Sequence, residues 1–171
     1  MNRILQRLDT THERLLATIA AIEQESFSRR PAENNWSIAE VVHHLCLVED
    51  RVIKDLEKAL SKPPRQLPFM RRLVPTAIVA YRLIRVKAPQ AVTPTNPPHK
   101  EEAIDNFKAA RAKLKDLCQS HGRQRLNQTT FKHPFLGEIN GVATISFVGY
   151  HEQRHYKQIR EIIGKLNGRY K

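Results

Sequence analysis

Proline placement is the strongest constraint that this sequence sets on its own fold. Eight of the ten prolines lie between residues 61 and 99, and only Pro31 and Pro134 lie outside that stretch. Proline removes a helical hydrogen bond and clashes with the preceding turn, so helices end at or before it. Long helices are therefore expected on either side of residues 61–99 and not within them.

Four segments show apolar residues spaced by threes and fours, which is typical of amphipathic helices. They run from Ile4 to about Glu25, from Ile38 to about Leu60, from about Lys100 to His121, and from about Val142 to Leu166. Gly122 and Gly168 follow the last two segments, as is common where helices end. No Val- or Ile-rich alternation is present, so we expect no strands.

The second helix has the clearest start signal. Ser37 can cap it while Glu40, three residues on, bonds back to the cap, which is a capping box. Trp36 before the cap and Val41 after it can form a hydrophobic staple. Pro63 and Pro64 stop the helix.

These segments predict an all-α fold, an up-down four-helix bundle with a long Pro-rich crossover between helices 2 and 3. We expect residues 1–171 to form a single domain, since residues 61–99 hold too few apolar residues for a core of their own. Leu73–Val86 is expected to form a short helix kinked near Pro75. A basic amphipathic stretch of this kind can lie on a membrane surface, but packing over the bundle is the favoured interpretation.

Composition narrows the class of protein and its partners. The longest charge-free stretch, Ile139–Tyr150, is about half of what a membrane span needs, and no signal-peptide core is present. Two cysteines are too few for a disulfide framework, so we expect a cytoplasmic protein. The formal net charge of +12 favours anionic partners or simply maintains solubility.

Two histidines on the fourth helix are the main candidates for chemistry. His151 and His155 are four residues apart, so their rings lie one turn apart on one helical face. They fill a gap in the apolar stripe between Val148 and Ile159, which turns both of them inward. Two core histidines satisfied by hydrogen bonds would explain the pattern, but two in succession on a buried face favour a metal site.

A third ligand is expected from the second helix. His44 lies between Val41 and Val48 on the apolar face, whereas His43 lies about 100° round the helix on a flank. Cys46 points nearly opposite to His44 and is a poor ligand for the same ion. Cys118 is expected to be a small buried apolar residue.

Three motifs in this order resemble the DinB/YfiT-like superfamily. The chain carries Trp36-Ser37-Ile38-Ala39-Glu40-Val41-Val42-His43-His44-Leu45 for the W-S-x-x-E-x-x-x-H-L signature, His133-Pro134-Phe135-Leu136-Gly137 for the connector, and His151-Glu152-Gln153-Arg154-His155-Tyr156-Lys157-Gln158-Ile159 for H-[DE]-x-x-H-x-x-Q-I. The resemblance implies a four-helix bundle in which His44, His151 and His155 hold a divalent metal ion. It further implies a homodimer.

The resemblance also suggests two chemistries, transfer of a low-molecular-weight thiol and hydrolase-like reactions. We therefore expect a metal-dependent enzyme, with zinc or nickel as the ion and a thiol of the mycothiol, bacillithiol or glutathione type as possible co-substrate. An anionic small-molecule substrate would match the basic charge. The alternative is a non-catalytic metal-binding or interaction protein associated with DNA damage or stress, although scattered charge makes nucleic acid an unfavoured partner.

Residues 151–155 also spell the His-Glu-x-x-His motif of zinc peptidases. Glu152 would reach an ion only from the flank, so we interpret it as a surface residue or as an indirect support of the ligands. Glu40 could orient His44, but the capping box uses it first, and Asp50 lies well off the face of His44. Tyr150 and Tyr156 flank the pair and are expected mainly to pack.

Overall fold

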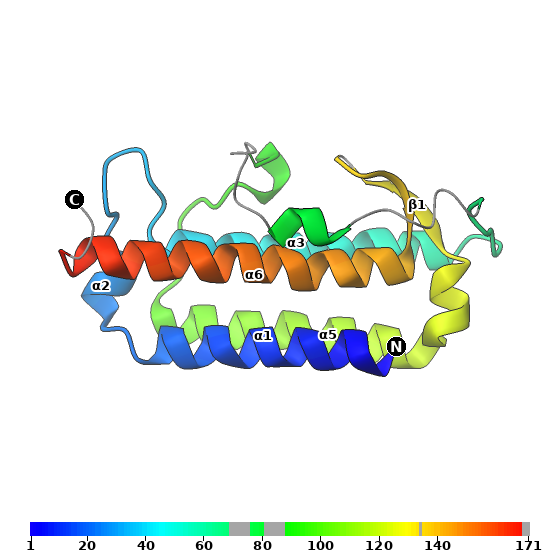
Figure 1. Ribbon diagram of the computed structural model, residues 1–171, viewed down its shortest axis with the longest axis horizontal. Coiled ribbons are helices and arrows are strands. Elements are labelled where there is room, and N and C mark those ends of the chain that lie inside the picture. Colours follow the sequence, from blue (N-terminus) through cyan, green and yellow to red (C-terminus); the bar gives the residue numbers. More distant parts are fainter. Residues whose placement is uncertain (69–75, 81–87, 134, 169–171) are drawn as a thin grey trace.

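The computed structural model describes residues 1–68, 76–80, 88–133 and 135–168. Four long helices form the bundle: α1 (Asn2–Ala20), α3 (Ile38–Leu60), α5 (Lys100–Asn127) and α6 (Gly141–Leu166). Short helices α2 (Gln24–Ser28), η1 (Thr76–Ala80) and η2 (Gln90–Val92) and a hairpin of β1 (Thr130–His133) and β2 (Gly137–Asn140) complete the described elements. Figure 1 shows α3 and α6 in one layer and α1 and α5 in the other.

The predicted bundle with a long crossover between its second and third long helices is confirmed. The crossover returns the chain to the end of the bundle where α3 begins, so that α3 and α5 run parallel and α1 and α6 run the opposite way (Figure 1). A helix of 23 residues is about 35 Å long, so a connection that returns along it needs at least about ten residues.

The start of α3 is formed as the sequence predicts. The Ser37 side chain accepts a hydrogen bond from the Glu40 backbone N–H. The Glu40 carboxylate in turn accepts a hydrogen bond from the Ser37 backbone N–H at 2.8 Å. The helix then continues without interruption to Leu60. This end of α3 is the reference point from which His44 is placed.

Three expectations about secondary structure were wrong. The first helix ends at Ala20 instead of near Glu25, because Lys100 at the start of α5 bonds to the Ile22 carbonyl and α2 begins after this corner. The third helix breaks at Gly122, as expected, where the backbone leaves helical geometry at a φ of 66° and a ψ of 169°. The error lies beyond this break, because a second helical segment follows to Asn127 where a non-helical connection was expected.

The third error concerns strands, since β1 and β2 form an antiparallel hairpin where none was expected. Each strand has four residues, which is too short for alternation to show in the sequence. The turn uses Gly137 at a φ of 69° and two backbone N–H groups that donate to His133 Nδ1.

The Pro-rich excursion packs against the bundle where it is described. Thr76–Ala80 lies alongside α6, and Gln90–Val92 contacts α3. The expected helix over Leu73–Val86 falls largely outside the described residues. Within that range the structure describes only Thr76–Ala80, which forms a short 3-10 helix.

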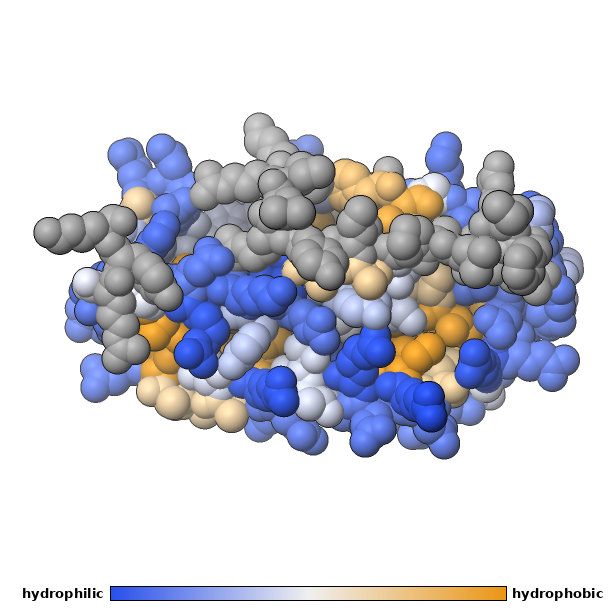
Figure 2. All heavy atoms as spheres, viewed as in Figure 1, coloured by the Kyte–Doolittle hydropathy of each residue, from blue (hydrophilic) through white to orange (hydrophobic). Residues whose placement is uncertain are grey.

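The core consists of two apolar clusters, one toward each end of the bundle. The first includes Leu15, Phe27 and Phe107, and the second includes Leu8, Leu56 and Leu114. The viewed surface is mainly hydrophilic (Figure 2), and Phe135 in the hairpin turn is the exposed large apolar residue among those described, at 59%. Among the described helices, none is long and apolar enough to cross a membrane.

The capping box provides a test of how α3 is held. Replacing Ser37→Ala should lower the free energy of unfolding by about 1 kcal/mol, because the Glu40 N–H loses its partner at a buried helix start. The matched control is Ser61→Ala at the other end of α3, where the exposed hydroxyl bonds only to Lys58 O. It should change stability by less than about 0.5 kcal/mol in urea unfolding. Equal effects would contradict the role assigned to the cap.

Candidate metal centre

Three imidazole rings converge in the layer formed by α3 and α6. The ligand atoms of His44, His151 and His155 all lie within 4.8 Å of one another. His44 and His155 are 4% and 7% exposed, and His151 is partly buried. The structure thus brings together all three histidines singled out from the sequence, from two helices and 107 residues apart in the chain.

The nitrogen spacing matches what one shared ion requires. His151 Nε2 lies 3.1 Å from His155 Nε2 and 3.4 Å from His44 Nε2. Two nitrogens bound to one tetrahedral zinc ion at about 2.0–2.1 Å lie about 3.3–3.4 Å apart. The distances from His151 to its two neighbours therefore match those between ligands of one ion, and all three ligand atoms lie within 4.8 Å of one another.

Hydrogen bonds on the far side of two rings direct their lone pairs inward. His44 Nδ1 donates to the Val92 carbonyl at 2.7 Å, and His155 Nδ1 donates to Gln158 Oε1 at 2.8 Å. A neutral imidazole with its proton on Nδ1 presents a lone pair at Nε2. Such outer bonds are typical of metal-ligating histidines, where they fix the ring and its tautomer.

Burial favours the neutral form of the His44 and His151 rings. It lowers the pKa of His44, against a smaller opposing effect of the Val92 carbonyl. It lowers the pKa of His151 well below its usual value, and the neighbouring His155 and His44 rings add to this effect. Neutral imidazoles are the form that binds metal ions.

Aromatic rings flank the three histidines on two sides. The Trp36 ring lies 5.1 Å from the His44 ring, and the Phe147 ring stacks on His151 at 5.4 Å. The His133 ring packs edge-on against Phe147 at 4.6 Å, which connects the hairpin to this end of the site. These contacts limit the rotamers open to His44 and His151.

His43 and the cysteines lie outside this cluster, as expected from the helical stripe. His43 is partly buried, with Nδ1 lacking a hydrogen-bond partner. Cys46 and Cys118 are free and buried, and burial raises the pKa of their thiols to about 12 and about 11. Thiols with such pKa values are protonated at neutral pH and are poor metal ligands.

The residues expected to play supporting roles divide as follows. Glu40 is used by the capping box and by Arg30, and does not orient His44. Tyr150 pairs with Arg7, whose guanidinium also lies 5.0 Å above its ring, and Tyr156 packs against the first apolar cluster.

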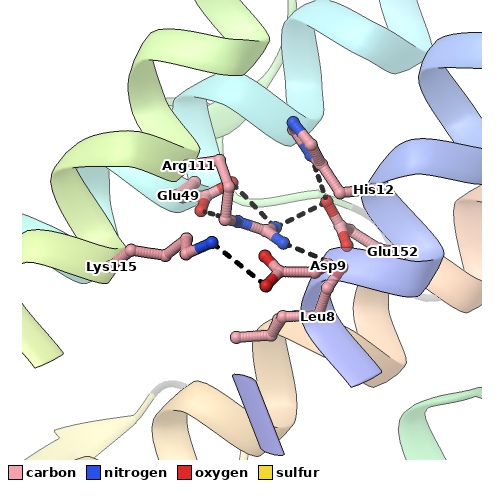
Figure 3. A network of polar contacts seen from close by, with 7 residues as sticks. All are labelled: Leu8, Asp9, His12, Glu49, Arg111, Lys115 and Glu152. Carbon is pink, nitrogen blue, oxygen red and sulfur yellow. Dashed lines mark hydrogen bonds and ion pairs between the residues drawn. The ribbon is translucent and has the colours of Figure 1, made fainter. Parts of the chain in front are cut away.

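The interpretation of Glu152 as a surface residue was wrong. It is 1% exposed and accepts from Arg111 Nη2 at 2.7 Å, with His12 Nδ1 3.4 Å from the same oxygen (Figure 3). It is turned into the bundle because position 152 lies between Val148 and Ile159 on the buried side of α6. Its contacts are with α1 and α5, which is not the arrangement of a peptidase general base.

Sequence reasoning missed two of the outer partners. Gln158 stands three residues after His155 and was part of the quoted motif, so helical spacing could have identified it. Val92 could not have been found, because it acts through a backbone carbonyl that any residue offers.

Similarity to known proteins extends over most of the chain. The sequence model of the DinB superfamily matches residues 5–159. The chain belongs to the DinB superfamily. It is 26% identical over 169 residues to "Uncharacterized protein YuaE" of Bacillus subtilis (strain 168), with 94% of each chain covered. It is 21% identical over 164 residues to "Putative metal-dependent hydrolase OB0413" of Oceanobacillus iheyensis, covering 96% of this chain and 86% of that protein.

Two solved structures share the fold. YfiT from Bacillus subtilis, described as a probable metal-dependent hydrolase with an unusual four-helix bundle topology, superposes with a TM-score of 0.67 at 13% identity. That match covers 97% of this chain and 87% of YfiT. The four-helix bundle protein TT2238 superposes with a TM-score of 0.63 at 24% identity, covering 94% and 98% of the two chains.

The lowered histidine pKa values predict how stability depends on pH without metal. Below about pH 6.5 the unfolded chain binds protons at His44 and His151 that the folded chain does not, so stability falls as the pH drops. Replacing His151→Gln should reduce the slope between pH 6.5 and 5, by at most about 1.4 kcal/mol per pH unit. Replacing the exposed Gln119→Ala on α5 removes no titrating group and should leave the slope unchanged. Chemical unfolding at a series of pH values measures both, and an unchanged slope in His151→Gln would contradict the neutral state of this ring.

Proposed function

We propose that the protein binds one divalent metal ion through His44, His151 and His155 and uses it to catalyse a reaction of a small molecule. The observation that carries this proposal is the convergence of three imidazoles, in which His151 Nε2 lies 3.1 and 3.4 Å from the Nε2 atoms of His155 and His44 while two Nδ1 atoms are bonded elsewhere. Zinc or nickel is the ion we expect, because both accept imidazole nitrogen. Three neutral histidines leave further coordination positions open, as in catalytic sites.

The chain's own residues hold the site and keep it rigid. The Val92 carbonyl and Gln158 fix two rings, and Trp36 and Phe147 pack beside His44 and His151. Because Val92 belongs to the Pro-rich excursion, we propose that residues 61–99 are part of the same functional unit as the bundle and that the chain is one domain. A divalent ion held there would lower the pKa of a water or thiol that coordinates it.

The reaction we propose is transfer of a low-molecular-weight thiol to an electrophile, with a hydrolase-like reaction as the second candidate. The net charge of +12 supports the first, because such thiols carry carboxylates. The name of the relative from Oceanobacillus iheyensis supports the second. We propose a cytoplasmic location, which the two free, buried cysteines support, because thiols stay reduced there. We further propose a homodimer, on the resemblance to the superfamily alone.

Metal content should differ between variants of the two adjacent histidines of α3. Replacing His44→Ala should empty the site, since two ligands from one helical turn hold a divalent ion weakly, whereas His43→Ala should retain about one ion per chain. Elemental analysis of tag-free protein measures this directly. At a thousandfold excess of metal over Kd, binding adds about 4 kcal/mol to stability, so chelation should lower the Tm of wild type and His43→Ala but not that of His44→Ala. The reverse pattern would refute the ligand set.

The reaction can be tested on the same proteins. Metal-loaded wild type is incubated with bacillithiol, mycothiol or glutathione and a fluorogenic electrophile, and separately with a chromogenic ester and no thiol. We expect thiol conjugation that is lost on chelation and in His44→Ala and persists in His43→Ala. Ester cleavage without thiol would favour the hydrolase-like candidate, and the absence of both activities in metal-loaded protein would contradict the proposal.

A further inference from the structure

Four buried polar residues form a layer across the middle of the bundle. Each long helix contributes one of them: His12 from α1, Glu49 from α3, Arg111 from α5 and Glu152 from α6. They are 6%, 2%, 3% and 1% exposed. We call these four residues the polar layer.

Arg111 is the centre of the polar layer (Figure 3). Its Nε and Nη2 donate to the two carboxylate oxygens of Glu49 at 2.7 and 3.3 Å, and Nη2 also donates to Glu152 Oε1 at 2.7 Å. Its Nη1 donates to the Leu8 carbonyl at 3.1 Å. One guanidinium thus bonds to three other helices at once.

The polar layer separates the two apolar clusters of the core. On α1, His12 lies between Leu8 of one cluster and Leu15 of the other, and on α3, Glu49 lies between Leu45 and Val52 in the same way. A core without this layer would be continuous from end to end.

The two helices that carry the metal site, α3 and α6, also contribute Glu49 and Glu152 to the polar layer. On α6, Glu152 follows His151 directly and precedes His155 by three residues. On α3, Glu49 follows His44 by five residues, about 7.5 Å along the helix axis. The contacts from Glu49 through Arg111 to Glu152 therefore join α3 to α6 beside the three imidazoles.

We propose that the polar layer positions the metal ligands, with Arg111 and Glu152 as positioning residues that set the rotation and height of α6 relative to α3. The inference rests on the proposed metal site and says which residues outside the histidines give it its geometry. Glu152 is then the part of the His-Glu-x-x-His sequence that aligns the helix.

Magnitudes show why such alignment is needed. Metal–ligand distances are set to within about 0.2 Å. An imidazole nitrogen about 7 Å from its helix axis moves by about 2.4 Å when the helix turns by about 20°. Apolar side chains attract without direction, so packing alone resists such a turn less specifically than bonds of fixed geometry do.

The chemistry of Arg111 fits alignment better than stabilisation. Buried ion pairs contribute little net stability, because desolvation offsets their attraction, and single buried polar residues are known to select register in helical assemblies. A guanidinium presents its donors in a rigid planar fork, which an ammonium group does not. Glu152 Oε2 is buried without a hydrogen-bond partner, so Arg111 and His12 hold this carboxylate through Oε1.

The test compares metal affinity with stability in matched variants. Arg111→Lys keeps the charge and loses the fork, and Glu152→Gln keeps the size and loses the charge. Leu117→Ala is the control, since this nearly buried residue lies on α5 in the second apolar cluster and outside the polar layer. Zn²⁺ affinity is measured by competition with a chromogenic chelator, and site geometry by the visible spectrum of the Co²⁺-loaded protein. Trp36, the single tryptophan, reports Co²⁺ binding by fluorescence quenching from beside His44.

We expect Arg111→Lys and Glu152→Gln to bind Zn²⁺ about 10- to 100-fold more weakly than wild type and to show an altered Co²⁺ spectrum. Leu117→Ala should lower the Tm of the metal-free protein while keeping wild-type affinity and spectrum below that Tm. If Arg111→Lys does not fold, the metal affinity and Co²⁺ spectrum of the isosteric Glu152→Gln variant test the positioning role. Wild-type affinity and spectrum in folded Arg111→Lys or Glu152→Gln would overturn the positioning role and leave the metal site standing. Failure of wild type to bind any metal through His44 would overturn the proposed function, and this inference with it.

Discussion

The bonds from Arg111 to Glu49 and Glu152 are the constraint on which the rest of this bundle depends. They join α5 to α3 and α6 in the middle of the core, and a further bond to the Leu8 carbonyl brings in α1. The two apolar clusters on either side supply most of the burial, but apolar burial is proportional to area and does not choose one helix rotation over its neighbours. A charged group with directed donors does favour one helix rotation, because any other rotation leaves a buried carboxylate without its hydrogen bonds.

The histidine cluster adds a second set of directed contacts next to the polar layer, since Glu152 lies between His151 and His155 on α6. Its outer bonds come from two sources, Gln158 on α6 itself and the Val92 carbonyl on the Pro-rich excursion. The excursion thus has a physical reason to be long: it must return from the far end of α3 and also bring an acceptor to His44. Its prolines suit this task, since proline disfavours long α-helices.

Most of the site could be predicted from sequence because its signals are local. The start of α3 follows from Ser37 and Glu40, and the inward face of His44 and His155 follows from helical spacing. The hairpin was missed since four-residue strands carry too little pattern. The helical segment after Gly122 was missed because a glycine indicates where a helix ends but not that another helix begins after it. The polar layer did have a signal: His12, Glu49 and Arg111 interrupt apolar stripes at core spacing. Pairing them needed the tertiary structure, because their partners lie 41 to 140 residues away.

The central claim is that three imidazole nitrogens share one divalent ion. X-ray absorption at the metal edge of the tag-free, metal-loaded protein tests it most directly, because the fine structure reports the type, number and distance of the ligands. For zinc, the account predicts three imidazole nitrogens at about 2.0–2.1 Å together with lighter oxygen ligands and no sulfur. Sulfur at about 2.3 Å, or a shell with fewer than three imidazoles, would contradict the assignment of His44, His151 and His155.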